Sequence, residues 1–200
     1  MTNQLLKEVQ RQHPKFFRAV AADARITLAF RAEPNGFTSR FRLLYEITRL
    51  AWVSDAFMAQ ILYRAKARLQ RFRIPILPTI FHRLSMMHSQ VCIGNPVVIE
   101  PGMYIAHGQV VIDGFTRIGT GVVLFPWVTI GLRAGNFQGP TIKNGVHVGT
   151  GAKIIGPITI GEGSIVGANA VVVKDVADLQ TVAGIPAEPF HDLIVKLEGE

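Results

Sequence analysis

Residues 142–172, IKNGVHVGTGAKIIGPITIGEGSIVGANAVV, decide the fold of this 200-residue chain. Every sixth position in the stretch is aliphatic: Ile142, Val148, Ile154, Ile160, Val166 and Val172. A period of six fits neither the 3.6-residue period of a helix nor the two-residue alternation of a strand. It is typical of a coil of short strands and tight turns, in which each repeat returns its aliphatic side chain to one interior wall.

The same period continues towards the N-terminus in two further runs, offset from each other by one inserted residue: Ile93, Ile99, Ile105 and Val111, then Ile118, Leu124 and Ile130. All but two of the 19 glycines lie in residues 94–184, as tight corners require. A β-sandwich would space its turns more widely, and a buried helix would not tolerate so many glycines. We therefore predict a mainly β protein whose repeat domain spans residues 89–189.

Residues 1–88 lack the repeat and show helical patterns instead. Apolar periodicity and prolines predict helices around residues 5–9, 16–30, 37–52 and 56–72, with Ser54 and Asp55 capping the last. We expect this N-terminal region to be α-helical and residues 190–200 to form a C-terminal tail with a short helix.

The two regions differ in charge. Of the 21 Lys and Arg residues 15 lie in residues 1–90, whereas only 5 of the 14 Asp and Glu residues do. Residues 61–73 form a basic amphipathic stretch, compatible with contact to an anionic membrane surface. A helix with its apolar stripe on the core and a solvated cationic face is the more frequent case, and we favour it. The positive charge is the only feature that favours nucleic-acid binding, so we do not expect the protein to bind nucleic acid.

Several classes of protein are disfavoured. One cysteine provides no internal disulfide framework, and neither a signal peptide nor an apolar run of membrane-spanning length is evident, so a cytoplasmic location is expected. The histidines and the cysteine lack zinc-ligand spacing, which predicts no metal site and argues against a metal-dependent β-helix enzyme. Phosphate-binding loops, nucleophile elbows and dinucleotide-binding fingerprints are not found either.

His107 is the first candidate for chemistry. It follows the aliphatic Ile105 by two residues and precedes Gly108, which places it on an outward-facing corner open to a substrate. Histidine is the side chain best matched to neutral pH for taking the proton of an attacking hydroxyl. A solvated histidine on a turn is the alternative.

Residues 131–141 are the second interruption, because Asn136 occupies a position that should be aliphatic. We predict a loop that leaves the coil after Ile130 and returns at Ile142. Loops carried on a rigid scaffold commonly bear binding residues, although a plain connection has the same appearance in the sequence.

Residues 91–189 resemble the hexapeptide-repeat acyltransferases, and within them the serine acetyltransferase group. The similar segments are 128–131, 148–156, 166–172 and 183–187. The resemblance implies a left-handed parallel β-helix, a homotrimer, and acetyl-CoA bound between neighbouring β-helices. It also implies that the pantetheine arm follows Gly149, Thr150, Gly151, Ala152, Gly167 and Ala168, and that Lys174 meets a phosphate.

His107 matches the general base of that family, but its usual companions are missing. Cys92 and Ala106 stand where the family carries Asp, and Gln138 and Gly139 replace an Arg-His pair before Pro140 that helps to hold the amino-acid acceptor. Glu100 or Asp113 is then a candidate to orient the imidazole.

These departures bear on the acceptor. We predict O-acetylation of a small acceptor, a sugar or another hydroxylated metabolite, since a neutral hydroxyl compound needs no guanidinium clamp. Serine, held by Arg133, is the alternative, and an inactive scaffold is a second one. The acceptor-binding candidates are Arg133, Asn136, Gln138 and Asp113.

Overall fold

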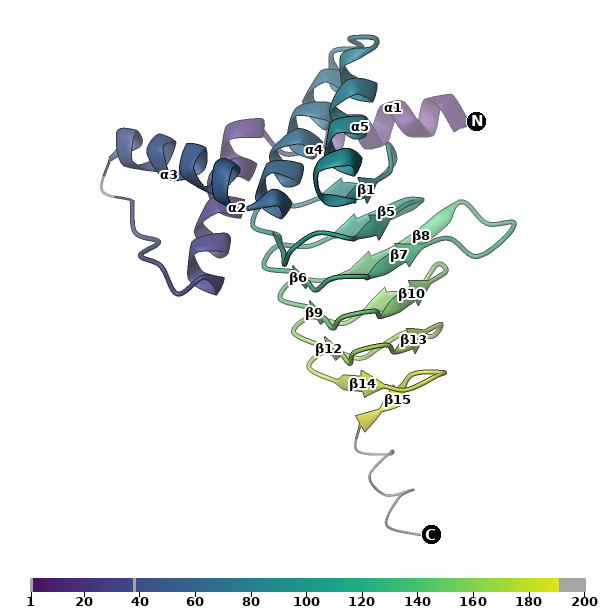
Figure 1. Cartoon of the computed structure of the whole chain (residues 1–200). Coiled ribbons are helices and arrows are strands. Elements are labelled where there is room, and N and C mark those ends of the chain that lie inside the picture. The colour runs from purple at the N-terminus through teal and green to yellow at the C-terminus, as the bar shows by residue number, and fades with distance from the viewer. Residues whose placement is uncertain (1, 38, 191–200) are drawn as a thin grey trace, which may run out of the picture.

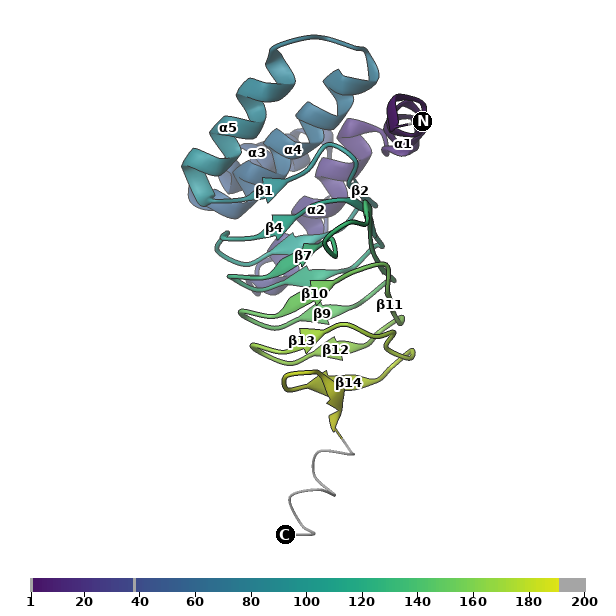
Figure 2. The same ribbon diagram turned by 90° about the vertical axis from the view of Figure 1, so that its right-hand side faces the viewer.

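The computed structural model describes residues 2–37 and 39–190, in which helices precede a stack of short-stranded coils (Figure 1). The helices lie above and beside the first coils, and the coils then follow one another along a single axis (Figures 1 and 2). The helices are α1 (Thr2–Gln12), α2 (Phe16–Phe30), α3 (Arg40–Val53), α4 (Asp55–Arg71) and α5 (Leu77–Ser89).

The coils form a parallel β-helix with three faces. The first sheet contains β1 (Cys92–Ile93), β4 (Val111–Ile112), β7 (Thr129–Gly131), β10 (Lys153–Ile155) and β13 (Val171–Val172). The second contains β2 (Val98–Ile99), β5 (Phe115–Ile118), β8 (Gln138–Ile142) and β11 (Thr159–Ile160). The third contains β3 (Tyr104–Ile105), β6 (Val123–Leu124), β9 (His147–Val148), β12 (Ile165–Val166), β14 (Thr181–Ala183) and β15 (Glu188–Pro189).

The repeated aliphatic residues fill the interior, as the period of six predicts. In the first sheet Ile112 is in register with Ile130, which is in register with Ile154, and all three side chains are fully buried. Val148 and Ile160 occupy equivalent buried positions in the other two sheets. Neighbouring strands are parallel throughout except at β14 and β15, which close the stack as an antiparallel pair.

One predicted interior position is wrong. Val111 is 41% exposed, while Ile112 is buried in register with Ile93. The inserted residue therefore lies before Ile112, in the corner that carries His107, and not after Val111. This corner is one residue longer than the equivalent corner between Leu124 and Ile130.

The predicted loop leaves the coil where expected but returns earlier. β8 begins at Gln138, and Gln138 and Thr141 pair with Phe115 and Arg117 of β5. The projecting segment is therefore residues 132–137, seen between β7 and β8 on the right of Figure 1.

The helical predictions hold for α2 and for the Ser54 cap, whose hydroxyl accepts a hydrogen bond from the Phe57 N–H at 3.3 Å. The pattern did not identify α5, because Pro75 and Pro78 interrupt it. Pro78 lies in the first turn of α5, where its missing N–H costs no helical hydrogen bond. The tail predicted at 190–200 lies outside the described residues from 191 onwards.

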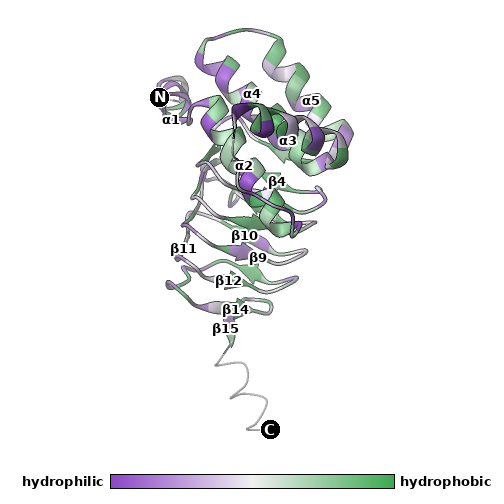
Figure 3. Ribbon diagram, turned by 90° about the vertical axis from the view of Figure 1, so that its left-hand side faces the viewer, coloured by the Kyte–Doolittle hydropathy of each residue, from purple (hydrophilic) through white to green (hydrophobic). Residues whose placement is uncertain are grey.

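Buried polar contacts join the helices to the first coil. Arg64 of α4 forms an ion pair with Asp23 of α2, at 2.9 Å between Nε and Oδ2, and its Nη2 donates to the Glu100 carbonyl at 2.8 Å. Asp23 Oδ1 also accepts from the N–H groups of Gly102 and Met103, at 2.9 and 3.1 Å. These bonds fix α2 and α4 against the first coil beside β3, the side seen in Figure 3.

The cationic face expected for residues 61–73 is therefore only partly solvated. Arg64 and Lys66 are buried, the first against Asp23 and the second with its Nζ donating to the Ile93 carbonyl. Burial lowers the pKa of Lys66 to about 8, and Cys92 and Asp113 counter that effect. Two of the charges that suggested contact with an anionic surface instead hold the fold together.

Candidate active site at the His107 corner

His107 lies on a corner with unusual backbone geometry. His107, Gly108 and Gln109 have φ values of 62°, 100° and 53°, a run in the left-handed region that costs energy for residues other than glycine. A Cβ on Gly108 would lie 2.3 Å from the Ser89 carbonyl oxygen, so only glycine fits there. The Gln109 N–H donates to that same carbonyl at 2.9 Å. Strained corners of this kind cluster at functional sites.

The exposed His107 side chain borders a cavity of about 200 Å³ between the β-helix and the helices. Tyr104 and Ile105 of β3 form one side, and the end of α2 and the start of α4 form the other. The charged residues that line it are Arg31 and Asp55. Neither one is recognisable from the sequence as a residue of this site, because Asp55 has the pattern of a helix cap and Arg31 that of a surface cation.

The two carboxylates that the sequence offered as partners of His107 do not line this cavity. Asp113 lines another cavity of about 390 Å³, together with Cys92 and His82. Its Oδ1 accepts from the Gly114 N–H at 2.8 Å. Glu100 is exposed. Asp55 is the carboxylate that shares a cavity with His107.

Cys92, at a position where the resembled family carries Asp, does not have the properties of a nucleophile. Burial raises the pKa of its thiol, and the nearby Asp113 carboxylate raises it further. Since the thiolate is the reactive form, Cys92 is poorly suited to covalent chemistry.

Within one chain the projecting loop does not reach His107. His107 precedes β4, whereas Arg133 and Asn136 follow β7, so they lie at opposite ends of the strands of the first sheet. Arg133 is exposed, and Asn136 Oδ1 accepts from the Gln138 N–H at 2.9 Å, which closes the loop.

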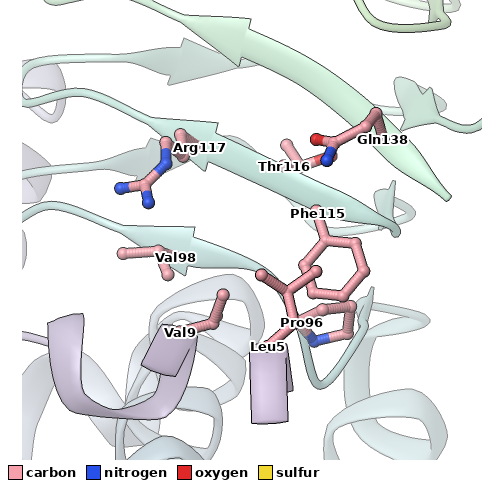
Figure 4. Close-up of a pocket in the computed structure, with 8 residues that line it drawn as sticks. All are labelled: Leu5, Val9, Pro96, Val98, Phe115, Thr116, Arg117 and Gln138. Carbon is pink, nitrogen blue, oxygen red and sulfur yellow. The ribbon is translucent and has the colours of Figure 1, made fainter. Parts of the chain in front are cut away.

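Gln138 lies in a third place. It lines a small cavity of about 110 Å³ between α1 and the second sheet, with Leu5, Val9 and Phe115 (Figure 4). The four predicted acceptor-binding residues therefore do not share the cavity of His107 in the single chain.

The predicted acyl-donor residues do come together. The Gly149 N–H donates to the Val166 carbonyl and the Asn169 N–H to the Thr150 carbonyl, both at 2.8 Å, so the two corners stack directly. A Cβ on Gly149 would lie 2.7 Å from the Ala168 nitrogen. Within the described residues the N–H groups of Thr150 and Ala168 donate to no backbone carbonyl. Lys174 lies apart, after β13, at the edge that carries the loop.

Neither a metal site nor a spanning helix is found in the part of the chain that the structure describes. Residues 2–37 and 39–190 hold no group of three or more His, Cys, Asp or Glu side chains placed to bind a metal ion. Among the helices of the same residues, none is long and apolar enough to cross a membrane.

Comparison with known proteins decides the family. The model of the bacterial transferase hexapeptide (six repeats) matches residues 139–174. A serine acetyltransferase of Synechococcus elongatus is 33% identical over 186 residues, which cover 91% of this chain and 72% of that protein. The chain belongs to the serine acetyltransferase family. A Bacillus subtilis serine acetyltransferase is 34% identical over 175 residues, covering 86% of this chain and 76% of the relative.

Solved structures agree with this placement. The chain is similar to the serine acetyltransferase of Neisseria gonorrhoeae, solved in complex with serine, with 26% identity and a TM-score of 0.71 over 93% of this chain and 73% of that one. The predicted left-handed parallel β-helix is thus confirmed, as is the enzyme class. The protein is an acyltransferase of the serine acetyltransferase type that uses acetyl-CoA as the acyl donor.

Proposed function

We propose that this serine acetyltransferase family member transfers the acetyl group of acetyl-CoA to the hydroxyl of L-serine, with His107 as the general base. The observation that carries the proposal is the position of His107 on the strained corner at the mouth of a small polar cavity. The names of the relatives support serine over the sugar that the sequence favoured.

The chemistry needs one base and one acyl donor. The imidazole of His107 takes the proton of the serine hydroxyl as its oxygen attacks the thioester carbonyl carbon. The tetrahedral intermediate then collapses, the carbon–sulfur bond breaks, and the imidazolium returns the proton to the leaving CoA sulfur. O-acetylserine and CoA are the products, so protons and charge balance.

Acetyl-CoA is held, in this proposal, along the stacked corners of the lower coils. The N–H groups of Thr150 and Ala168 offer hydrogen bonds to the amide carbonyls of the pantetheine arm. Gly149 and Gly167 have no side chain to project from this surface, and a Cβ on either one would come too close to the next corner.

A homotrimer completes the site in this proposal. The loop that carries Arg133 and Asn136 lies at the far end of the first sheet from His107 in its own chain. A neighbouring β-helix packed beside the His107 corner would bring its own loop and Lys174 there. Light scattering at micromolar concentration should report a trimer, and a stable, active monomer would contradict the shared site.

A second acceptor class is favoured by one observation. Cys92 and Ala106 replace two carboxylates of the family, and Gln138 and Gly139 replace its Arg-His pair. Loss of those charges suits a neutral hydroxyl compound such as a sugar.

Free-thiol release from acetyl-CoA, measured with serine, homoserine, sugars and nucleotide sugars, separates the two classes. We expect the highest kcat/KM with L-serine. Substitution His107→Ala should lower turnover with every acceptor by about 10²–10⁴-fold while leaving the fold and CoA binding intact. Near-normal turnover by a correctly assembled His107→Ala protein would remove His107 from the mechanism.

A further inference from the structure

The corners that lead from the third sheet to the first sheet lie one below another along the β-helix (Figure 1). The strand pairing makes three of them equal in length and equivalent residue by residue: 125–128, 149–152 and 167–170. The corner that carries His107 lies directly above the first of these, because the Trp127 N–H donates to the Gln109 carbonyl at 2.8 Å. The corner at 125–128 therefore separates the proposed base from the two corners proposed to bind the pantetheine arm.

This corner differs in chemistry from the two beneath it. Its first three residues are Phe125, Pro126 and Trp127, which we call the apolar corner, whereas the same positions of the next two coils are Gly-Thr-Gly and Gly-Ala-Asn. Pro126 has no N–H, and it occupies the position at which Thr150 and Ala168 have N–H groups that donate to no backbone carbonyl in the described residues. The column of available N–H groups therefore ends one coil below the base.

Trp127 has an exposed indole at a position that suits a smaller residue. Its φ is 67° and its side chain is 57% exposed. The equivalent residues Gly151 and Asn169 have the same left-handed conformation, which glycine and asparagine adopt most readily. A bulky residue is rare there, and an exposed one gains no core packing in return. Because folding does not explain this residue, its backbone strain points to a role in binding.

We propose that the apolar corner binds the acyl group of the donor, and that Trp127 determines which acyl groups are accepted. The inference rests on the proposed function for the pantetheine-binding corners and for the base. An alkyl group accepts no hydrogen bond, so it is better placed on an apolar surface without N–H groups than on the corners below. That surface lies between those corners and His107, where the thioester carbon has to be attacked.

An open apolar corner should accept acyl groups longer than acetyl. Phe125 is 37% exposed and Trp127 more so, which leaves apolar surface on which a longer chain can lie. Each methylene moved from water onto such a surface raises affinity by about two- to four-fold. The reaction does not change, since the same carbon–sulfur bond breaks and the same ester bond forms. We therefore expect the enzyme to transfer propionyl and butyryl groups as well.

The test uses calorimetry on the full-length, assembled protein without acceptor, with CoA, acetyl-CoA, propionyl-CoA and butyryl-CoA as ligands. In the wild type the Kd should fall by about two- to four-fold with each methylene added to acetyl-CoA. In Trp127→Gly this dependence should disappear, while the Kd of CoA itself stays close to the wild-type value. Trp127→Gly should fold, because glycine adopts the φ of 67° without strain.

Turnover provides a second readout. With L-serine as acceptor, Trp127→Gly should lower the ratio of kcat/KM for butyryl-CoA to that for acetyl-CoA by about 4- to 16-fold, the contribution of two methylenes. Trp127→Asn, which places the residue of position 169 in the second coil, should have the same effect.

Trp52→Phe is the matched control. It removes the other tryptophan of the chain, which is 88% exposed on α3, and should leave all four Kd values unchanged. It also leaves Trp127 as the only indole. The fluorescence of this variant should therefore change more on addition of butyryl-CoA than on addition of CoA.

Thr150→Pro separates the apolar corner from the corners below. It removes one N–H at a position where Pro126 shows that the corner accommodates proline. This variant should weaken the binding of all four ligands, CoA included, and keep the dependence on chain length.

Two outcomes overturn the inference. If chain length does not affect the Kd of the wild type, or affects that of Trp127→Gly equally, the acyl group does not lie on Trp127. If Trp127→Gly weakens CoA and its esters by one factor, or dissociates the oligomer in light scattering, Trp127 contacts another part of the ligand or a neighbouring chain. Failure of the proposed function is distinguishable, because absence of transfer to L-serine leaves the Kd series, measured without acceptor, intact.

Discussion

The first coil and the lower coils of the β-helix are stabilised in different ways. Below β4 the interior is a column of aliphatic side chains in register, and each coil uses the same contacts as the next. The first coil is joined to α2 and α4 by buried charged and polar groups, of which Asp23, Arg64 and Gln60 are examples. The stability of the repeat is roughly the sum of contributions from each coil and its neighbours. The stability of the junction depends instead on a few buried groups that form hydrogen bonds and ion pairs with one another.

This difference also separates two kinds of functional residue. The residues proposed to bind the acyl donor lie on the regular coils, where the repeat alone determines their positions. The cavity beside His107 is formed where the helices meet the first coil, so its shape depends on the polar junction. Changes in the junction should therefore affect acceptor use more than CoA binding.

The largest effect is expected from Asp23→Ala. The substitution leaves Arg64 buried without its partner, and removal of one member of a buried pair costs about 3–5 kcal/mol. Guanidinium unfolding at a fixed protein concentration measures the loss. A loss below about 1 kcal/mol would show that the junction contributes little to stability.

Ile154→Ala tests the regular coils. Ile154 is fully buried between Ile130 and Val172, and the change leaves a cavity that costs about 2–5 kcal/mol. Because the loss is apolar, it should be the same at pH 7 and pH 5 in the same unfolding experiment. A marked pH dependence would contradict the contrast between the two regions.

His13 gives the junction a pH dependence. Burial lowers its pKa from 6.5 to about 4, with Arg64 and Lys66 adding to the effect, and both ring nitrogens are buried without a partner in the described residues. The unfolded chain therefore binds the proton more readily. The stability that neutral His13 allows is present above about pH 6.5 and is lost as the pH falls towards 4, by about 3 kcal/mol in all.

His13→Phe removes this titration while it keeps a ring of similar size. The difference in unfolding free energy between wild type and variant should grow in favour of the variant from pH 7 to pH 4.5. The carboxylates titrate in both proteins, so their contributions cancel in this difference. A difference that does not change with pH would mean that His13 has the same pKa in the folded and the unfolded state.

The smallest effect is expected from Lys143→Ala on the lower coils. Its Nζ lies 2.9 Å from Asp178, but both side chains are exposed, and the Asp178 carboxylate also accepts from the Glu162 N–H. Exposed pairs of this kind contribute little and are screened by salt. The melting temperature should not change measurably, and a clear drop would show that the lower coils also depend on charge.

Much of the β-helix was predictable because its signal is periodic. The error at Val111 arose where the period breaks, since a single inserted residue can be placed on either side of a strand that reads Val-Ile. For the same reason the sequence did not predict that the corner carrying His107 is one residue longer. The early return of the loop at Gln138 was missed because Gln138–Thr141 pair with β5 without an aliphatic repeat.

The sequence alone determined the repeat, its corners, the general-base candidate and the stacked glycines of the lower coils, because each depends on residues close together in the chain. Only the tertiary structure decided that Arg64 and Lys66 are interior, that Asp113 and Gln138 lie away from His107, and that Arg31 and Asp55 lie beside it. The reason is physical: a charged residue has the same appearance in the sequence whether it is solvated or buried. Its partner, such as Asp23 for Arg64, is defined by packing between distant segments.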